Sequence, residues 1–326
     1  MKRILALLLV LVLALTAFVG CKKDKDPVEK DYTLAIGVVV AKDADTCEVV
    51  ENAAVIVTDK DGKIVLCRLD CIEYKLDVDM DAEEIVTTAP VSKVALGEDY
   101  DKKNYMAAGD WYKQAAALET YVVGKTQSEV AAIALDSSGK VTDTELKASC
   151  SIGVSALLAA IDAAFESEHK VSFKSTATAF TAGLNLAASI KENIVDEEDE
   201  YSVNAEYTVE YAAAVLADGK VVAAILDTAV AKLNNLSAEE VDEDEFAFSA
   251  ESISYPGTKR EQGDAYDSYS PMPAGRWYEQ ADAYASAAVG LTKDNIASLA
   301  SSGVAGCTIY AGGYKAGLEA AVKAAR

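Results

Sequence analysis

A segment built around tryptophan and tyrosine occurs twice in this chain and constrains the fold more than any other feature. The first copy is residues 109–115 (GDWYKQA) and the second is residues 275–281 (GRWYEQA), an offset of 166 residues. The two copies contain both tryptophans of the 326-residue chain. Self-similarity over such a distance indicates a duplicated structural unit. We therefore predict two tandem modules, residues 32–166 and residues 167–326, the second an internal repeat of the first.

The match between the two halves continues outside the tryptophan segments at the same offset. The matching residues of the first half are Gly97, Tyr100, Asp101, Met106, Ala108, Val123, Gly124 and Thr126. Their counterparts in the second half are Gly263, Tyr266, Asp267, Met272, Ala274, Val289, Gly290 and Thr292. The similarity therefore covers the whole region around each tryptophan.

Apolar, β-branched runs before each tryptophan segment predict strands. In the first half these runs include residues 34–41 and 55–57, and an Asp61-Gly62 pair follows. An Asp-Gly pair between such runs is a strong hairpin signal, because the turn requires positive φ angles. The second half has Asp218-Gly219 at the corresponding place. Apolar residues alternate after each turn, which predicts an antiparallel sheet with one buried face.

The tryptophan segment itself predicts a helix that packs on the sheet. Trp111 begins an apolar stripe with helical spacing, and Gly124 or Gly290 lies where a glycine commonly ends a helix. Each module is then expected to close with a short strand, at residues 148–152 and 305–309, followed by an amphipathic helix. The predicted fold class is α+β, with each module a small antiparallel sheet packed on one face by helices.

The N-terminal region predicts secretion and lipid attachment. Lys2 and Arg3 precede an uncharged Leu-rich stretch, which is typical of a signal peptide at residues 1–20. The stretch ends in FVGC, which resembles the lipobox of bacterial lipoproteins, in which the cysteine, here Cys21, receives the lipid. An ordinary signal peptide with an incidental cysteine is the alternative. Residues 21–31 are charged and would form a tether, so the mature protein would be anchored to the bacterial cell membrane outside the cytoplasm.

The charge of the chain argues against one class of partner. The formal net charge is −23, from 53 acidic and 30 basic residues. Such a surface repels phosphate backbones, so we expect no nucleic-acid binding. The charge favours solubility near an anionic surface, and a specific acidic face for cations or a basic partner is the alternative.

Metal and nucleophile chemistry find little support in the sequence. An Asp-x-Asp-x-Asp run at residues 77–81 has the spacing of a calcium loop, but Ala82 and Thr88 stand where that loop requires glycine and glutamate, so we expect no metal. The single histidine, His169, lies at the junction of the modules and is expected to be a solvated linker residue. Five cysteines remain after Cys21, an odd number without close pairs, which predicts buried free thiols.

The duplicated aromatic pair has two interpretations. As a functional feature, Trp111, Tyr112, Trp277 and Tyr278 would form platforms for a sugar, a peptide or a planar cofactor. As a folding feature, each tryptophan would pack its helix onto its sheet. Large aromatic residues on an apolar stripe are usually buried, so the second interpretation is favoured. The four residues remain the candidates for ligand contact, and the cleft between the modules is the expected place for a ligand.

Several of these motifs together resemble those of a known group of proteins. The Asp-Gly-Lys hairpin, the G-x-W-Y-x-Q-A helix and a small-Cys-Ser/Thr-Ile segment look like uncharacterised duplicated-domain cell-surface lipoproteins of Gram-positive bacteria. This resemblance brings no established activity. A more distant resemblance is to the FMN-binding domains of secreted redox proteins, in which a Ser-Gly-Ala-Thr motif carries flavin on its threonine. That resemblance implies Gly306 and Thr308 as flavin contacts, with Ser151 at the matching place in the first module.

The sequence thus predicts a location and an architecture rather than a specific activity. We expect a lipid-anchored extracytoplasmic surface protein that is a binding or structural component rather than an enzyme, and that has no cofactor. The first alternative is an FMN-carrying protein of extracytoplasmic electron transfer. The second is the solute-binding component of a transporter.

Overall fold

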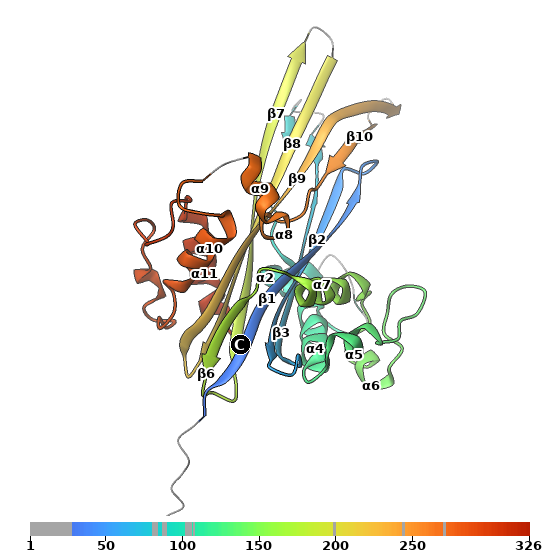
Figure 1. Cartoon of the computed structure of the whole chain (residues 1–326). Coiled ribbons are helices and arrows are strands. Elements are labelled where there is room, and N and C mark those ends of the chain that lie inside the picture. Colours follow the sequence, from blue (N-terminus) through green and yellow to red (C-terminus); the bar gives the residue numbers. More distant parts are fainter. Residues whose placement is uncertain are drawn as a thin grey trace, which may run out of the picture.

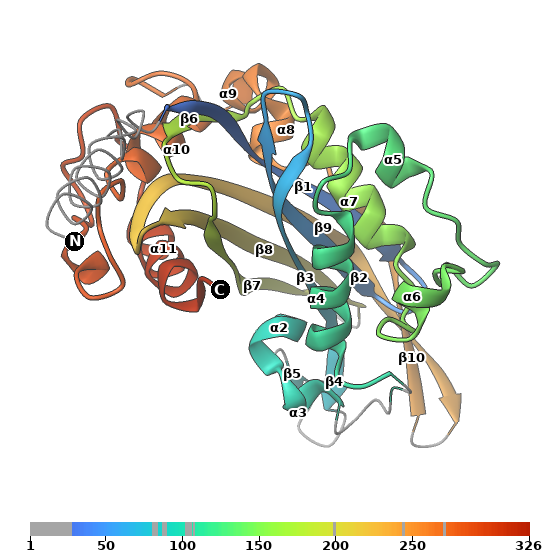
Figure 2. The same cartoon turned by 90° about the horizontal axis from the view of Figure 1, so that it is seen from below.

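The computed structural model places the strands of both halves of the chain in the middle of the molecule and the helices outside them. It describes residues 28–79, 84–86, 90–101, 106, 108–197, 200–242, 245–269 and 272–326. Figure 1 shows the helices of the first half on one outer side, those of the second half on the other, and the strands between them. The view from below shows the same order of layers (Figure 2). The fold is α+β with two antiparallel four-stranded sheets, as far as these residues extend.

The first sheet has the strand order β3-β2-β1-β6. Its strands are β1 (Lys30–Asp43), β2 (Glu48–Asp59), β3 (Ile64–Lys75) and β6 (Val171–Ser175). All neighbouring strands are antiparallel. The turn between β2 and β3 contains Gly62 at φ 73°, which confirms the hairpin predicted from the Asp-Gly pair.

The second sheet has the order β10-β9-β8-β7. Its strands are β7 (Thr181–Glu197), β8 (Glu200–Ala217), β9 (Lys220–Asp242) and β10 (Glu245–Ser254). The turn between β8 and β9 has positive φ at both Asp218 (49°) and Gly219 (76°), so the second predicted hairpin is confirmed as well. A separate two-stranded piece, β4 (Asp77–Asp79) and β5 (Glu84–Val86), follows the first sheet in the chain.

The two four-stranded sheets pack against each other, which corrects the prediction of one buried face for each sheet. One apolar core lies between them and includes Leu34 and Val55 from the first sheet and Val209 and Ile225 from the second. Separate cores lie on the helix-covered faces. Adjacent residues of one strand, such as Val55 and Ile56, are therefore both buried, one in each core. The alternation of apolar residues in the sequence after the hairpin turns reported only one face of each sheet. The structure shows that the other face is apolar and buried as well.

Helices cover the outer face of each sheet. Those over the first sheet are α2 (Lys93–Leu96), α3 (Glu98–Asp101), α4 (Trp111–Val122), α5 (Gln127–Ala131), α6 (Thr144–Lys147) and α7 (Ser155–Glu166). Those of the second half are α8 (Lys259–Gln262), α9 (Asp264–Tyr269), α10 (Trp277–Ser286), η1 (Ile296–Ser298) and α11 (Gly312–Ala324). Within the described ranges, none of the helices has the length and apolar character needed to cross a bilayer.

The short strands predicted at residues 148–152 and 305–309 are wrong. Both segments are loops that lead into α7 and α11. In the first loop, the backbone N–H groups of Ser151 and Ile152 donate to the side-chain oxygen of Gln114 (2.7 and 3.2 Å) instead of to a neighbouring strand. A side chain thus provides the partner that a strand would have provided.

The junction between the halves is built into the structure. β6 follows the predicted junction in the chain, yet it pairs with β1 and completes the first sheet. The prediction of a solvated linker histidine is also wrong: the ring of His169 stacks on Tyr278 with centroids 3.8 Å apart, and its carbonyl accepts a bond from the guanidinium of Arg260 (3.0 Å).

Candidate ligand-binding site

The two tryptophans begin equivalent helices, α4 and α10, and both are buried. Trp111 is 5% exposed and Trp277 is 2% exposed, each within the core between its sheet and its helices. Trp277 also makes edge contacts with the rings of Tyr266 and Tyr314. Tyr112 is half-buried, and the ammonium group of its neighbour Lys113 lies 5.4 Å from the centre of its ring. Packing therefore accounts for both tryptophans, and their contact with a ligand stays a prediction.

The glutamine of the duplicated segment has a structural role that sequence reasoning missed. Gln114 and Gln280 are fully buried. The amide of Gln280 donates to the carbonyl of Gly275 (2.9 Å), and its oxygen accepts from the backbone and hydroxyl of Thr308 (both 2.8 Å). Gln114 holds Ser151 in the same way (2.7 and 3.1 Å). The conserved spacing within the two copies was the signal that pointed to this glutamine.

The residues implied by the flavin resemblance lie in these glutamine-bound loops. The hydroxyls of Ser151 and Thr308 are donors to their glutamines, and Gly306 has φ 79°, in the left-handed region. Covalent attachment of flavin to Thr308 would have to break the bond from its hydroxyl to Gln280. Flavin binding stays a prediction of the resemblance.

A second duplicated motif, a serine or threonine followed by lysine, begins α2 and α8. Ser92 and Thr258 lie 166 residues apart and cap these short helices. Each is close to a buried aspartate of the neighbouring strand: Asp70 in β3 accepts a bond from the Ser92 hydroxyl (2.6 Å), and Asp227 in β9 accepts one from the backbone of Arg260 (3.1 Å). The sequence contained the signal for this motif too. Ser92 and Thr258 are separated by the offset of the tryptophan segments, and Asp70 and Asp227 by the offset of Asp61 and Asp218.

The two aspartates are held in environments that disfavour their charged form. Burial raises the pKa of Asp70 to about 6, although the bond from Ser92 acts in the opposite direction. Burial likewise raises the pKa of Asp227 to about 6, against the effect of the nearby Arg260. Each carboxyl fastens a short helix to its sheet, and so fixes the position of the lysine that follows the capping residue.

The two lysines of this motif lie over the aromatic rings of their own modules. The Lys93 nitrogen is 4.8 Å from the ring centroid of Tyr100 and 5.4 Å from that of Trp111. The Lys259 nitrogen is 5.1 Å from Tyr266 and 5.3 Å from Trp277. These are cation–π distances, so the duplicated tryptophans also stabilise a duplicated cation.

The two lysines differ in their acidic partner. Lys93 forms an ion pair with Glu73 of β3. The residue of β9 that corresponds to Glu73 is Val230. Glu73 pairs with Val50 of β2, and Val230 pairs with Thr208 of β8, so the two residues hold the same place in their pairs of strands. Among the residues that the structure describes, Lys259 makes no ion pair with a carboxylate.

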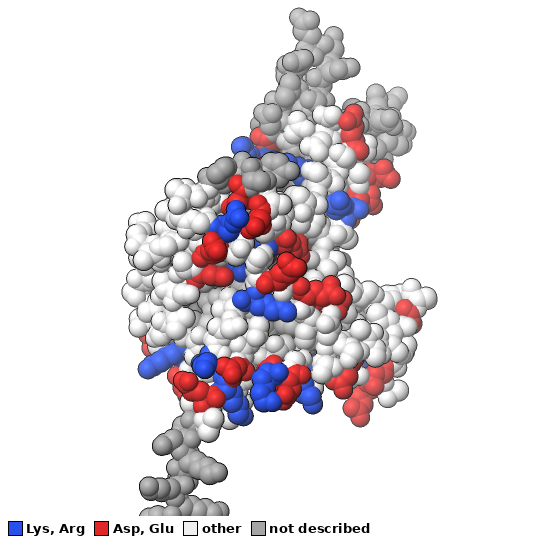
Figure 3. All heavy atoms as spheres, viewed as in Figure 1, with Lys and Arg blue, Asp and Glu red and all other residues white. Residues whose placement is uncertain are grey.

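A pocket adjoins each lysine on the outer side of its sheet. The pocket beside Lys93 has a volume of about 540 Å³ and is lined by Tyr100, Met106, Trp111, Lys140, Ser151 and Ile152 among others. The pocket beside Lys259 has a volume of about 690 Å³ and is lined by Thr208, Thr228, Val230, Ser254, Tyr255, Pro256, Gln262 and Tyr266, and by the ion pair of Lys232 with Glu206. On the face shown in Figure 3, acidic and basic side chains are intermixed over the middle and the lower part of the molecule, whereas the surface over α10 and α11 carries few charges.

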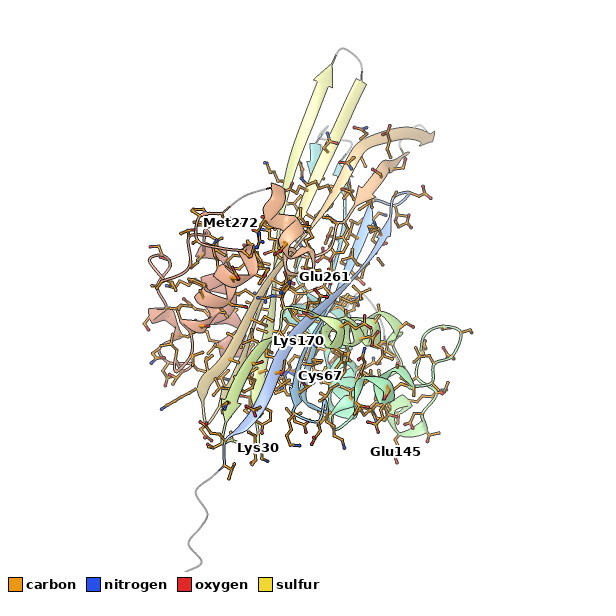
Figure 4. All side chains as sticks on the ribbon, in the orientation of Figure 1. Lys30, Cys67, Glu145, Lys170, Glu261 and Met272 are labelled. Atoms are coloured by element: carbon orange, nitrogen blue, oxygen red, sulfur yellow. The ribbon has the colours of Figure 1, made fainter. Side chains whose placement is uncertain are left out.

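The predicted place for a ligand is a cleft between the two halves, but little open space lies there. Apolar side chains of the core fill the space between the two facing sheets. A pocket at the junction has a volume of only about 230 Å³ and is lined by His169, Arg260 and Glu261 among others. Figure 4 labels Glu261, which lies in α8, and Lys170, which follows His169 in the chain.

A fully buried carboxyl group lies in the inter-sheet core. Glu51 of β2 is fully buried and accepts bonds from the hydroxyls of Tyr74 in the first sheet (2.6 Å) and Tyr211 in the second. Burial raises the pKa of Glu51 to about 7, and the bonds from the two tyrosines partly oppose this rise. This carboxyl therefore joins the sheets as a hydrogen-bond acceptor.

Metal and thiol chemistry are not indicated by the described part of the chain. It contains no group of three or more His, Cys, Asp or Glu residues arranged to hold a metal ion. Asp77 and Asp79 of the calcium-like run lie in β4, and Asp81 lies outside the described residues. Cys47, Cys67, Cys71 and Cys150 are buried free thiols, as predicted, and Cys307 is half-buried and free.

Comparison of the chain with protein-family models, with curated proteins and with solved structures gave no match. The geometry of the two lysine pockets is therefore the basis for a functional proposal.

Proposed function

We propose that this chain is a lipid-anchored extracytoplasmic protein, built from two copies of one module, that binds a small molecule. The signal-like residues 1–20, Cys21 and the charged tether support the location. The membrane is then a partner through the N-terminal lipid, and the net charge of −23 argues against nucleic acid.

Equivalent hydrogen bonds in the two halves support the duplication. The backbone of Gly124, after α4, donates to the carbonyl of Ile64 at the start of β3 (2.7 Å). The backbone of Gly290, after α10, donates to the carbonyl of Val221 at the start of β9 (2.8 Å). Together with the two glutamine-bound loops, these bonds repeat the same connections at nearly constant offsets.

The observation that carries the binding proposal is the pocket beside each equivalent lysine. Both pockets combine a cation, an aromatic wall and a volume within the range of about 300–1,000 Å³ that is usual for small-molecule sites. A purely structural component would not require such pockets. The same observation favours a solute-binding component of a transporter as the second candidate, since such a protein binds its solute outside the cytoplasm.

Metabolic labelling with a fatty-acid probe in a bacterial host tests the location. We expect label on the wild-type protein and none on Cys21→Ser. The wild-type protein should also be accessible to protease in cells that have lost their outer layers but keep an intact cytoplasmic membrane. An unlabelled, freely secreted wild-type protein would show that the lipid anchor is wrong.

A further inference from the structure

We propose that the pocket beside Lys259 binds the carboxylate of a small organic acid, in the position that the Glu73 carboxylate occupies beside Lys93. This inference rests on the proposed binding function and names its site and ligand class.

The two lysines have the same local surroundings. Each follows a capping Ser or Thr, lies in the first position of a short helix, and sits over a tyrosine and a tryptophan of its own module. The strand beneath each lysine is paired in the same register. The structure around Lys93 therefore shows how this kind of site is completed when a carboxylate is present.

The second site lacks that carboxylate. Val230 replaces Glu73 and cannot neutralise the lysine. Burial raises the pKa of Glu210 in β8, and the charge of Lys259 acts in the opposite direction, so this carboxyl interacts with the lysine through space without a direct ion pair among the described residues. A half-buried ammonium group without a direct ion pair is less stable than a paired one, and an anion from outside would supply that pair.

The other charged groups of the pocket, and the hydroxyl of Thr228, already have partners. Glu206 forms an ion pair with Lys232 (3.0 Å), and the Thr228 hydroxyl is bonded to the hydroxyl of Tyr314 (2.7 Å). Lys259 is thus the cation of the pocket that remains available to an anion, among the described lining residues.

The remaining walls indicate what the rest of the ligand is like. Val230, Tyr255, Pro256 and Tyr266 provide apolar and aromatic surface. A volume of about 690 Å³ leaves room for more than a carboxylate. The pocket therefore fits an organic acid with a flat or apolar body, with the acid group at Lys259 and the body against the tyrosines.

Calorimetric titration of the full chain in neutral detergent tests this site with phenylacetate as the probe and phenylacetamide as its uncharged control. We expect binding of phenylacetate and at least about tenfold weaker binding of the amide, because the charge-assisted bond to lysine is lost. Lys259→Met and Val230→Glu should each weaken phenylacetate binding about tenfold or more, whereas Val230→Gln, which adds a similar volume without charge, should change it less than about threefold.

The first module provides the reciprocal experiment. Glu73→Val should uncover Lys93 and raise the number of phenylacetate sites from one to two. Near-ultraviolet circular dichroism of every variant shows whether its fold is retained.

The site is wrong if wild-type protein does not bind phenylacetate with Kd below about 10 mM, if the amide binds equally well, or if folded Lys259→Met binds as the wild type does. Binding that persists in Lys259→Met would place the ligand elsewhere and leave the proposed binding function intact. Failure of Cys21 labelling would overturn the anchor without affecting the result at Lys259.

Discussion

Gln114 and Gln280 are buried polar side chains whose hydrogen bonds are each made within one half of the chain. Each connects the loop before a tryptophan helix with the loop before the last helix of the module. A buried amide that is fully bonded stabilises one arrangement of the chain, and its loss leaves several backbone groups without partners. At the scale of residues, the glutamine therefore explains the duplicated segment as much as the tryptophan does.

Gln280→Leu should lower the free energy of unfolding by about 2–4 kcal/mol, because the carbonyl of Gly275 and the N–H of Thr308 lose their buried partner. Thr308→Val removes one hydroxyl bond and should cost only about 1 kcal/mol. Urea unfolding followed by tryptophan fluorescence measures both. Equal losses in the two variants would contradict the central role of the glutamine.

Glu51 should make the protein more stable in mild acid than at alkaline pH. Its pKa in the folded state is about 7, above the ordinary value of 4.5, so the folded state retains a proton that the unfolded state releases. The stabilisation is complete below about pH 4.5 and is lost as the pH rises through about 7, by about 3 kcal/mol.

Urea unfolding at several pH values between about 5 and 8 measures this dependence. Glu51→Gln, which keeps an acceptor for the tyrosines and cannot ionise, should remove about half of the dependence and nearly all of it above about pH 6. Asp70 and Asp227 have pKa values raised in the same direction to about 6, so the slope below about pH 6 should remain in the variant. An unchanged slope in Glu51→Gln would contradict the assignment.

At the scale of elements, a glycine lets each closing helix lie directly on its sheet. A Cβ atom on Gly37 of β1 would lie 2.2 Å from the backbone nitrogen of Ala164 in α7. A Cβ atom on Gly183 of β7 would lie 1.9 Å from the carbonyl oxygen of Ala321 in α11. Helix backbone and strand backbone are thus in contact, and the alanines of the helices complete the close approach.

Gly37→Ala and Gly183→Ala should each destabilise the protein by about 1–3 kcal/mol, since a helix must move away from its sheet. Gly153→Ala is the matched control, because its Cβ atom would be 3.4 Å from the carbonyl of Ser138, an ordinary contact, and it should change stability by less than about 0.5 kcal/mol. Thermal unfolding of the three variants decides the matter, and similar losses in all three would contradict the close approach.

At the scale of the whole molecule, the two halves of the chain form one packed unit. They share the apolar core between the sheets, and β6, which follows the junction in the chain, completes the first sheet. Glu119 of α4 accepts hydrogen bonds from the guanidinium groups of Arg326 (2.9 and 3.0 Å) and Arg68 (3.2 Å). Glu119 also accepts the backbone N–H of Leu69 (2.9 Å). One buried carboxylate thus joins a helix, a strand and the end of the second half.

Glu119→Gln should destabilise the protein by about 2–4 kcal/mol, because it removes the counter-ion of Arg68, which is largely buried, and of Arg326, which is half-exposed. Glu319→Gln, which weakens two longer contacts of 3.6 Å to Lys315 and Lys323 on the surface of α11, should cost less than about 1 kcal/mol. Calorimetry of both variants measures the difference. An equal, small effect would show that the cluster does not hold the modules together.

Local patterns were enough to predict several features of this protein. The Asp-Gly pairs predicted both hairpin turns, because positive φ at these residues depends only on the turn itself. The helical spacing after Trp111 predicted α4, and the duplication predicted that Trp277 would begin a matching helix. The candidate ligand residues were located less well: Trp111, but not Trp277, is among the residues that line a pocket beside a lysine.

Only the tertiary structure decided the features that join residues far apart in the chain. Burial of both faces of each sheet, the pairing of β6 with β1 and the bonds of Gln280 depend on which elements meet, and no local pattern contains that information. The contrast between Lys93 and Lys259 belongs here as well. Both copies have the same lysine motif in sequence, but strand register brings glutamate to one and valine to the other, and therefore leaves one of the two cations for a ligand.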